Sequence, residues 1–372
     1  MSRDPTVPGG STRRHGFGIA GAGAIVAMHA QAIAMLPAGR LIAVTDVAPE
    51  SARAFAETHG CAAEPDLSAL LARADIDVVS VCVPSGLHAE VGTQAAAAGK
   101  HLVIEKPIDT TLAAADRLIG AAHTAGVVMT VVSQHRFDPG LAELRRLLDA
   151  GALGRLVLGE ASTKWYRSQA YYDSAAWRGT WALDGGSLMN QGIHYVDLLL
   201  WAMGPVAEVT ALTATQAHEV EVEDVALALL RFCSGAVGTI VASTAVFPGF
   251  AQRLEITGTN GTVVIEDGQI VHRDISGEES GSAAPGTPAP GGSAGHGPGA
   301  GANPAGLDPA SHAAQIADLL GAIDAGRQPS VTAESGRAAL EVVCAVYQSA
   351  REGRKIALPT AAGGTRGGAG MK

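Results

Sequence analysis

The feature that most constrains the fold is an alternation of short strand-like and helical segments between Gly16 and Ser133. Runs rich in β-branched and aliphatic residues alternate with longer Ala- and Leu-rich segments of helical periodicity. The predicted strands are Phe17–Ala20, Leu41–Thr45, Val78–Val83, Leu102–Ile104 and Val127–Val132. The predicted helices are Ile25–Leu36, Ser51–His59, Ala89–Ala98 and Leu112–Ala125. Strands that alternate with helices of this length predict βαβ units and a parallel sheet.

A glycine-rich turn, GIAGAG over residues 18–23, closes the first predicted strand and opens the first predicted helix. Gly21 permits a tight turn, and Gly23 lets the backbone approach a pyrophosphate at the helix N-terminus. Val26 stands at the third position of the GxGxxG pattern, where a smaller residue is usual. In this context the turn predicts a Rossmann cofactor-binding domain over residues 15–137. The residues of the turn expected to bind the cofactor are Gly21, Gly23, Ala24 and Ile25.

Asp46 directly follows the second predicted strand. A carboxylate at this place can bond the adenosine ribose hydroxyls and would repel a 2′-phosphate. No Arg or Lys follows it before Arg53. We therefore expect NAD rather than NADP. The alternative, an ordinary strand–helix turn with a surface aspartate, fits the complete βαβ context less well.

After Pro139 the pattern changes to successive strands with few helices. Such an order predicts an α+β domain with a large, mostly antiparallel open sheet, over residues 138–358. The turn residues Thr259-Asn260-Gly261 predict a hairpin before a strand at Thr262–Glu266. The other predicted strands are Leu156–Lys164, Val206–Thr215, Val225–Phe232, Ala236–Ala245 and Gln252–Thr257. The predicted helices are Leu141–Ala150, Asn190–Met203, Ala313–Ala325 and Ala333–Glu352.

Three segments lack the pattern of a packed structure. Residues 276–306 consist mainly of Gly, Ala, Pro and Ser, which bury too little apolar surface to offset their ordering entropy. We expect a disordered loop there, a disordered tail at residues 1–14 and a flexible tail at residues 359–372.

Composition excludes several classes of protein. A net charge of −10 disfavours binding to nucleic acid or to an anionic membrane. No apolar run reaches membrane-spanning length, and the N-terminus lacks an apolar signal core. The four cysteines show no CxxC pairing, so we expect neither a metal site nor disulfides, and a cytoplasmic location.

Glu105-Lys106-Pro107 ends the fourth predicted strand, at the carboxyl edge where doubly wound sheets bind their ligands. Pro84 and Ser85 end the third strand at the same edge, followed by His88. An isolated strand-end lysine is most often a solvated surface residue. Here the proline that follows restricts the backbone and predicts a rigid X-Pro turn, possible in the cis form.

The helical segment after Asp184 carries a polar stripe on an otherwise apolar sequence. Asn190, His194 and Asp197 are spaced i, i+4 and i+7, which places them on one helical face. A lone helical histidine is usually structural, but three polar residues on one stripe need a polar cleft to face. An imidazole can accept a hydroxyl proton, and an ammonium in the same cleft can stabilise a developing alkoxide. Such a pair of groups suits hydride removal from a carbinol.

With these motifs in view, the chain resembles the GFO/IDH/MocA family of oxidoreductases (glucose–fructose oxidoreductase and inositol dehydrogenase). The matching segments lie in order between residues 16 and 359 and leave only the tails and the Gly/Pro-rich loop unmatched. They read GIAGAG, VPSGLH, AAAAGKHLVIEKP, SQHRFDP, WRGTWALDGGSLMNQGIHYVDLLLWAMG and EGRKIALP.

The resemblance implies hydride transfer between the carbinol of a sugar, sugar nucleotide or polyol and a nicotinamide. It assigns His194 as general acid/base and Lys106 as the group that bonds the reacting oxygen. Many inositol dehydrogenase-like members carry an aspartate where this chain has Asn190, which puts a Lys–Asp–His relay in doubt. Asn190 is expected to orient the substrate instead, as the MNQGIH sequence suggests for the nucleotide-sugar dehydrogenase-like branch. The cofactor site is expected to include Asp46, Pro84, Ser85, His88, Glu105 and Lys106 in addition to the glycine-rich turn.

Six aromatic side chains crowd between Trp165 and Trp181, interspersed with arginines. Aromatic faces suit the C–H side of a pyranose, and arginine suits a carboxylate or phosphate. The alternative is a loop anchored by core aromatics or used in subunit contacts. His135 is a further candidate for the cleft. The residues expected to bind substrate are Lys106, Arg136, Trp165, Arg167, Tyr172, Arg178, Asn190 and His194.

Two other functions remain open for such a chain. One is a redox-neutral glycosidase that uses bound NAD transiently; the other is a non-catalytic regulator that senses a sugar or NAD on the same fold. The presence of both Lys106 and His194 disfavours a regulator. We expect a homo-oligomer, dimer or tetramer, because an open sheet with one apolar face needs a cover.

Overall fold

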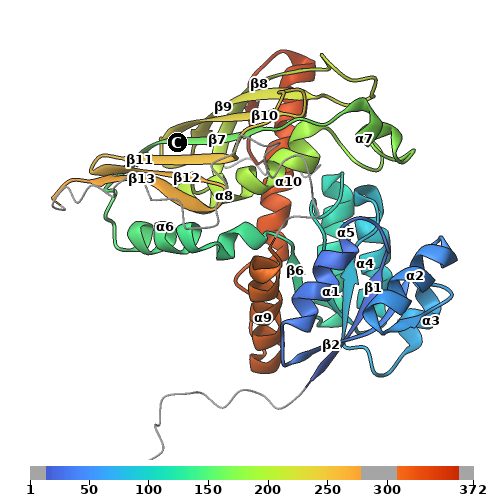
Figure 1. The fold of residues 1–372 in the computed structure, drawn as a ribbon. Helices are drawn as coiled ribbons and strands as arrows, with labels where there is room; N and C mark the ends of the chain where they lie inside the picture. Colours follow the sequence, from blue (N-terminus) through green and yellow to red (C-terminus); the bar gives the residue numbers. More distant parts are fainter. Residues whose placement is uncertain (1–13, 278–307, 360–372) are drawn as a thin grey trace, which may run out of the picture.

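The computed structural model describes residues 14–277 and 308–359, which form two sheets and the helices that cover them (Figure 1). The predicted N-terminal tail, almost all of the Gly/Pro-rich loop and nearly all of the C-terminal tail lie outside these described residues. None of the described helices has the length and apolarity needed to cross a bilayer.

The N-terminal sheet has six parallel strands in the order β3-β2-β1-β4-β5-β6, which confirms the predicted Rossmann-type fold. Its strands are buried on both faces because helices cover both sides. The short β3 and α3 were not predicted. The strands are β1 His15–Ala20, β2 Gly39–Thr45, β3 Ala62–Ala63, β4 Val78–Val81, β5 His101–Ile104 and β6 Met129–Val131. The helices are α1 Val26–Ala34, α2 Pro49–His59, α3 Leu67–Ala72, α4 His88–Ala97 and α5 Leu112–Ala125.

The second sheet has eight strands in the order β13-β12-β11-β7-β10-β9-β8-β14. Only β7 and β10 pair in parallel; the other neighbours are antiparallel, as predicted for an open sheet. The predicted hairpin turn joins β11 to β12, with Gly258 opposite Gly261. The strands are β7 Leu156–Lys164, β8 Val206–Ala214, β9 Val225–Phe232, β10 Val237–Ser243, β11 Arg253–Gly258, β12 Gly261–Glu266, β13 Gln269–Ile275 and β14 Ile356–Ala357. The helices that follow the first sheet are α6 Pro139–Asp149, α7 Gln169–Asp173, α8 Ile193–Met203, α9 Ala310–Ala325 and α10 Ala333–Glu352.

Among the described residues, helices cover only one side of the large sheet. Residues of β9 alternate between buried and exposed, which is the period expected of a strand with one face in the core. Helices α8 and α10 pack against the buried side (Figure 1). The uncovered side bears Leu212, Leu227 and Leu229, which are 71, 43 and 62% exposed.

The C-terminal helices return to the N-terminal sheet. Helix α9 packs against α1, and its residues Ile316 and Leu319 join the core on that face (Figure 1). Helix α10 contacts α5 and β6 with its first half, where Gly336 lies against Val131. Its remainder packs under the large sheet. These contacts hold the carboxyl edge of the parallel sheet next to α8.

Candidate functional site

The glycine-rich turn between β1 and α1 has the geometry that a dinucleotide needs. Gly21 has φ +99°, and a Cβ there would come within 2.5 Å of the carbonyl oxygen of Cys82, so only glycine fits. Gly23 and Ala24 are exposed, and a Cβ on Gly23 would meet nothing within 4 Å. Amides in the first turn of a helix lack intrahelical acceptors. The residues at this turn therefore fit a bound pyrophosphate.

Asp46 lies beside this turn, at the end of β2. One carboxylate oxygen accepts the amide N–H of Ala22 at 2.6 Å, and the other accepts that of Ala48 at 2.8 Å. Asp46 thus orients the glycine-rich turn, and its predicted contact with the ribose of a cofactor stays a prediction. The first role could not be read from the spacing of the motif.

Lys106 lies just beyond β5, and the peptide bond between Lys106 and Pro107 is cis. Its ammonium donates to the backbone oxygen of Asn190 at 2.6 Å and lies 3.4 Å from the side-chain oxygen of Asn190. Burial lowers the pKa of Lys106 below its usual value. The structure therefore joins the end of the cofactor sheet to the segment before α8.

The segment that carries Asn190 differs from its prediction. Residues Ser187–Gly192 form a π-helical turn, and the α-helix begins only at Ile193. The prediction of an α-helix from Asn190 was therefore wrong in its first turn. π-helical turns inside helices are rare and often occur at functional sites. Asn190, in this π-helical turn, is bonded to Lys106. The turn leads directly into α8, which contains His194.

His194 and Lys106 line one small hollow, together with Asp197, Ser133 and Pro107. Burial lowers the pKa of His194 well below 6.5, and the positive charge of Lys106 acts in the same direction. Its Nδ1 atom is buried, and no hydrogen-bond partner for it lies in residues 14–277 or 308–359. A neutral imidazole next to an ammonium can accept a proton from a hydroxyl that enters the hollow.

Asp184 fixes the orientation of the Asn190 amide. Its carboxylate accepts from Nδ2 of Asn190 and, at 2.7 Å, from the amide of Gly179. The Asn190 oxygen consequently faces Lys106 rather than the opposite way. Burial raises the pKa of Asp184, while its bonds to Gly179 and Asn190 and the charge of Lys106 lower it.

Glu105 and His88 lie beneath the cofactor edge. Glu105 is bonded at 2.7 Å to His29, and although burial opposes its ionisation, this bond lowers its pKa to about 2. His88 is 1% exposed, with its ring nitrogens 2.7 and 2.9 Å from the carbonyl oxygens of Pro107 and Val83. Both side chains are directed to protein partners, so their predicted contact with a cofactor stays a prediction. Pro84 and the buried Ser85 begin the short helical turn after β4.

Arg136 is held by Asp197 in a buried ion pair, with distances of 2.7 and 2.5 Å. The neighbouring His135 stands edge-on to His194, with ring centroids 5.1 Å apart, and bonds Asp138 at 2.7 Å. These contacts connect the segment after β6 to α8. Substrate binding by Arg136 stays a prediction, since its guanidinium already has a carboxylate partner.

The aromatic segment between β7 and the π-helical turn surrounds two arginines. Arg167 lies 5.1 Å from the ring of Trp165, and Arg178 lies 4.4 Å from the ring of Tyr171. The hydroxyl of Tyr172 instead shares a hydrogen bond of 2.8 Å with the hydroxyl of Thr244, and burial raises the pKa of Tyr172 to about 12. Its predicted contact with substrate likewise stays untested.

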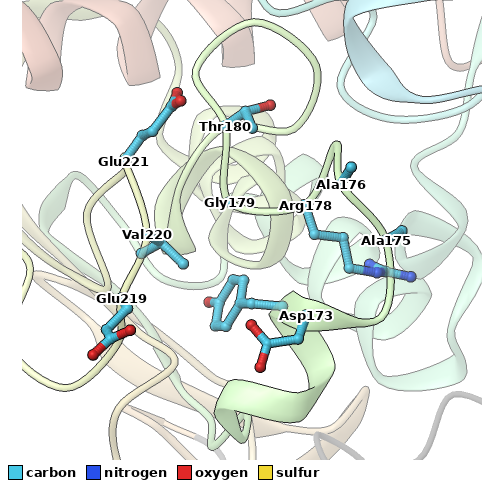
Figure 2. A pocket seen from close by; sticks show the side chains of 10 residues that line it. Asp173, Ala175, Ala176, Arg178, Gly179, Thr180, Glu219, Val220 and Glu221 are labelled. Carbon is cyan, nitrogen blue, oxygen red and sulfur yellow. The ribbon is translucent and has the colours of Figure 1, made fainter.

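This segment and residues 219–221 line a cavity of about 430 Å³, and neither Lys106 nor His194 is among its lining residues (Figure 2). Its walls include Arg178 and the carboxylates of Asp173, Glu219 and Glu221. Three carboxylates give this cavity an acidic lining. It is therefore separate from the hollow that Lys106 and His194 share.

The sequence motifs do not indicate the partners of several residues near the site. Asp184 precedes the GGS segment, and His135, already a candidate for the cleft, follows β6, but tertiary packing alone brings them to Asn190 and His194. Glu223 and Tyr347 lie more than thirty residues from Leu188 in sequence but bond the π-helical turn directly. No local pattern could have found them, because tertiary packing brings them together.

Comparison with known proteins matches both halves of the chain. Residues 15–133 match the oxidoreductase family with an NAD-binding Rossmann fold, and residues 141–264 match the GFO/IDH/MocA C-terminal domain. The WlbA dehydrogenase from Bordetella pertussis, solved in complex with NADH and UDP-GlcNAcA, is 32% identical, with a TM-score of 0.84. The match covers 94% of this chain and 99% of that one.

Two inositol 2-dehydrogenases are also similar. That of Rhizobium meliloti (strain 1021) is 28% identical over 349 residues, which are 92% of this chain and 98% of the relative. That of Acidothermus cellulolyticus is 30% identical over 269 residues, covering 71 and 76% of the two chains. With the cofactor turn, the large open sheet and these matches together, the chain belongs to the GFO/IDH/MocA family of NAD-dependent oxidoreductases.

Proposed function

We propose that this chain transfers hydride between a secondary carbinol of a sugar, sugar nucleotide or polyol and NAD. The observation that carries the proposal is the hollow that Lys106 and His194 line together at the carboxyl edge of the cofactor sheet. Lys106 follows β5 of the first sheet, whereas His194 lies in α8, which packs under the second sheet. NAD, when bound, supplies the hydride acceptor or donor.

Each polar group of the hollow has a distinct task. His194, with its lowered pKa, is neutral at pH 7 and takes the hydroxyl proton of the substrate. Lys106 stabilises the oxygen as negative charge develops on it, an interaction stronger in the transition state than in the ground state. Asn190 cannot exchange a proton, so it holds Lys106 and orients the substrate by hydrogen bonds.

The cofactor would be held by the backbone of Gly21, Gly23, Ala24 and Ile25, with Asp46 on the ribose. A carboxylate at that place supports a preference for NAD over NADP. The similarity to WlbA and the MNQGIH sequence favour a sugar nucleotide as substrate, whereas the similarity to inositol 2-dehydrogenases favours a free polyol.

The test is a screen of sugars, polyols and nucleotide sugars with NAD, followed by nicotinamide absorbance. On the substrate it identifies, Lys106→Gln should lower kcat by ~100-fold or more, because an electrostatic contact to the reacting oxygen is lost. Its affinity for NADH should change little. Lys164→Gln, which removes an exposed lysine at the end of β7, is the matched control. Unchanged turnover in Lys106→Gln would remove this lysine from the mechanism.

The same screen separates the alternatives. A redox-neutral glycosidase would release a cleaved sugar without net formation of NADH. A regulator would bind sugar and NAD and convert neither. Only net, stoichiometric reduction of NAD, or oxidation of NADH in the reverse direction, fits the proposed dehydrogenase.

A second copy of the chain is proposed to cover the open side of the large sheet. Leu212 and Leu227 are cross-strand partners on that side, and Leu229 lies on the same face of β9. Exposed apolar patches of this kind mark interaction surfaces. Leu229→Lys should shift the chain to a lower oligomeric state in light scattering; an unchanged mass would rule this face out as the interface.

A further inference from the structure

Arg167 and Arg178 both pack against Tyr171, whose hydroxyl is linked through Gln191 and Asn190 to Lys106. The charges of both arginines act on Lys106, and burial together with these charges lowers its pKa. Glu105 and Asp184 oppose this effect. Both carboxylates already have other partners, however. Glu105 is bonded to His29, and Asp184 accepts a hydrogen bond from the side chain of Asn190. In a chain of net charge −10, this local excess of positive charge is notable.

Within the part of the chain that the structure describes, Arg167 is a buried cation without a carboxylate partner. It is 7% exposed, and no described residue forms a hydrogen bond with its Nε atom. One terminal nitrogen donates to the carbonyl oxygen of Tyr166 at 3.3 Å, and no ion pair to Arg167 occurs among the described residues. The rings of Trp165 and Tyr171, 5.1 and 5.2 Å away, offset only part of the desolvation cost.

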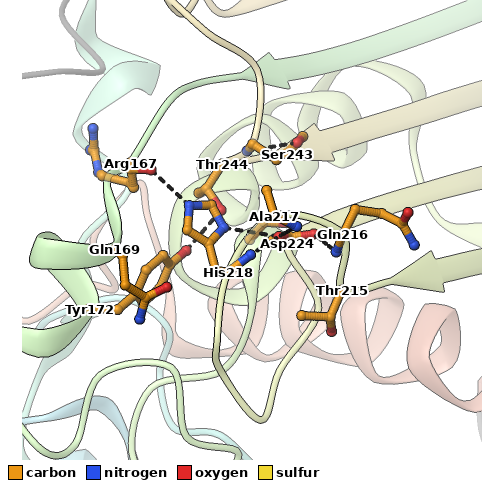
Figure 3. Close-up of polar contacts among 12 residues, drawn as sticks. Arg167, Gln169, Tyr172, Thr215, Gln216, Ala217, His218, Asp224, Ser243 and Thr244 are labelled. Carbon is orange, nitrogen blue, oxygen red and sulfur yellow. Dashed lines mark hydrogen bonds and ion pairs between the residues drawn. The ribbon is translucent and has the colours of Figure 1, made fainter.

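The backbone of Arg167 is held from both sides (Figure 3). Its amide donates to the carbonyl oxygen of Thr244 at 2.8 Å. Its own carbonyl accepts from Nε2 of His218 at 2.8 Å, and Nδ1 of His218 lies 2.9 Å from Asp224. A buried cation that is fixed in place without a counter-ion is what a prepared anion site requires.

Arg178 extends the cluster toward the reacting groups. It donates to the hydroxyl of Tyr171 at 2.7 Å, and Gln191 donates to the same hydroxyl at 3.3 Å. Gln191 also donates to the Asn190 oxygen at 3.0 Å. No carboxylate forms an ion pair with Arg178 among residues 14–277 and 308–359. A hydrogen-bonded path therefore runs from Arg178 to Lys106.

We propose that Arg167 and Arg178 form a subsite for an anionic group of the substrate, a carboxylate or a phosphate. This rests on the proposed function only in that the anion belongs to the sugar that enters the hollow. Guanidinium groups suit either group through paired hydrogen bonds. Arg178 also lines the cavity described above, but Asp173, Glu219 and Glu221 outnumber it there. The subsite is therefore placed on the face of Arg178 that bonds the Tyr171 hydroxyl, next to Gln191.

The test measures binding by calorimetry to the NADH-loaded protein, so it does not depend on turnover. The probes are glucose, glucuronate, UDP-glucose and UDP-glucuronate, which vary the carboxylate and the diphosphate independently. Arg167→Gln should weaken anionic probes by at least ~30-fold, about 2 kcal/mol, and leave glucose within about threefold. Arg145→Gln is the matched control, because Arg145 stacks on Trp201 and pairs with Asp149 away from the site.

The pattern across probes identifies the group. A loss for both UDP-sugars but not for glucuronate assigns the diphosphate; a loss confined to the two uronates assigns the carboxylate. An effect of Arg167→Gln equal to that of Arg145→Gln, or a loss equally large for glucose, overturns the proposal.

Should Arg167→Gln fail to fold, the wild-type protein still decides. No preference for any anionic probe over its neutral counterpart would overturn the subsite. Failure of the proposed function would be seen in a different experiment, as unchanged turnover in Lys106→Gln or as no reduction of NAD. The calorimetric binding measurement does not depend on either result.

Discussion

Glu223 is a buried carboxyl behind the π-helical turn, and its replacement by glutamine should change how stability depends on pH. The side chain is 3% exposed. One oxygen accepts from the amide of Leu188 at 2.9 Å and from the hydroxyl of Tyr347 at 3.1 Å, whereas the other oxygen has no hydrogen-bond partner in the described part of the chain. Burial raises the pKa of Glu223 from 4.5 to about 7.

The magnitude follows from linkage. Because the folded state holds the proton more tightly, the contribution of Glu223 to stability is fully present below pH 4.5 and is lost as the pH rises through about 7. The separation of the two pKa values corresponds to about 3 kcal/mol in total. About 2.5 kcal/mol of it falls between roughly pH 5 and pH 8. Glu223→Gln stays uncharged and lacks this loss.

Urea denaturation of wild type and Glu223→Gln at a series of pH values measures the effect. The free energy of unfolding of the variant should gain on that of wild type by about 2.5 kcal/mol from roughly pH 5 to pH 8. Glu57→Gln, on the exposed face of α2, controls for the loss of a negative charge. A wild-type-to-variant difference that stays constant with pH would refute the assignment of a buried carboxyl that resists ionisation.

Three further outcomes are expected. The wild-type protein should bind NAD about tenfold more tightly than NADP, a difference of roughly 1.4 kcal/mol, and Asp46→Ala should abolish this preference. Calorimetry measures both affinities, and equal affinities in wild type would contradict the ribose assignment. Gly23→Val should prevent NADH binding with little change in Tm, since a Cβ there meets no protein atom within 4 Å; retained NADH affinity would move the pyrophosphate elsewhere. Arg136→Met should cost about 3–5 kcal/mol in urea denaturation, because it leaves Asp197 buried and unpaired, and the added change Asp197→Leu should restore part of the loss. No recovery would mean that the ion pair is not the cause.

Local patterns in the sequence determined the elements and the class of each sheet. Hydrophobic periodicity and glycine punctuation depend on neighbours a few residues apart, so they predicted Leu112–Ala125, Leu156–Lys164 and Ala333–Glu352 with their observed bounds. The cofactor turn was predictable for the same reason, because a strand, a tight turn and a helix are consecutive. Short elements such as β3, with only two residues, carry too little pattern to be recognised.

Tertiary structure alone decided which distant side chains meet. Helix α9 returns to the N-terminal sheet, Asp184 turns the Asn190 amide toward Lys106, and Arg167 is buried without a carboxylate partner among the described residues. The sequence could name Lys106 and Arg167 as candidates but not their surroundings. Charge, burial and hydrogen bonding at the site arise from contacts between segments tens to hundreds of residues apart, and periodicity along the chain carries no information about such contacts.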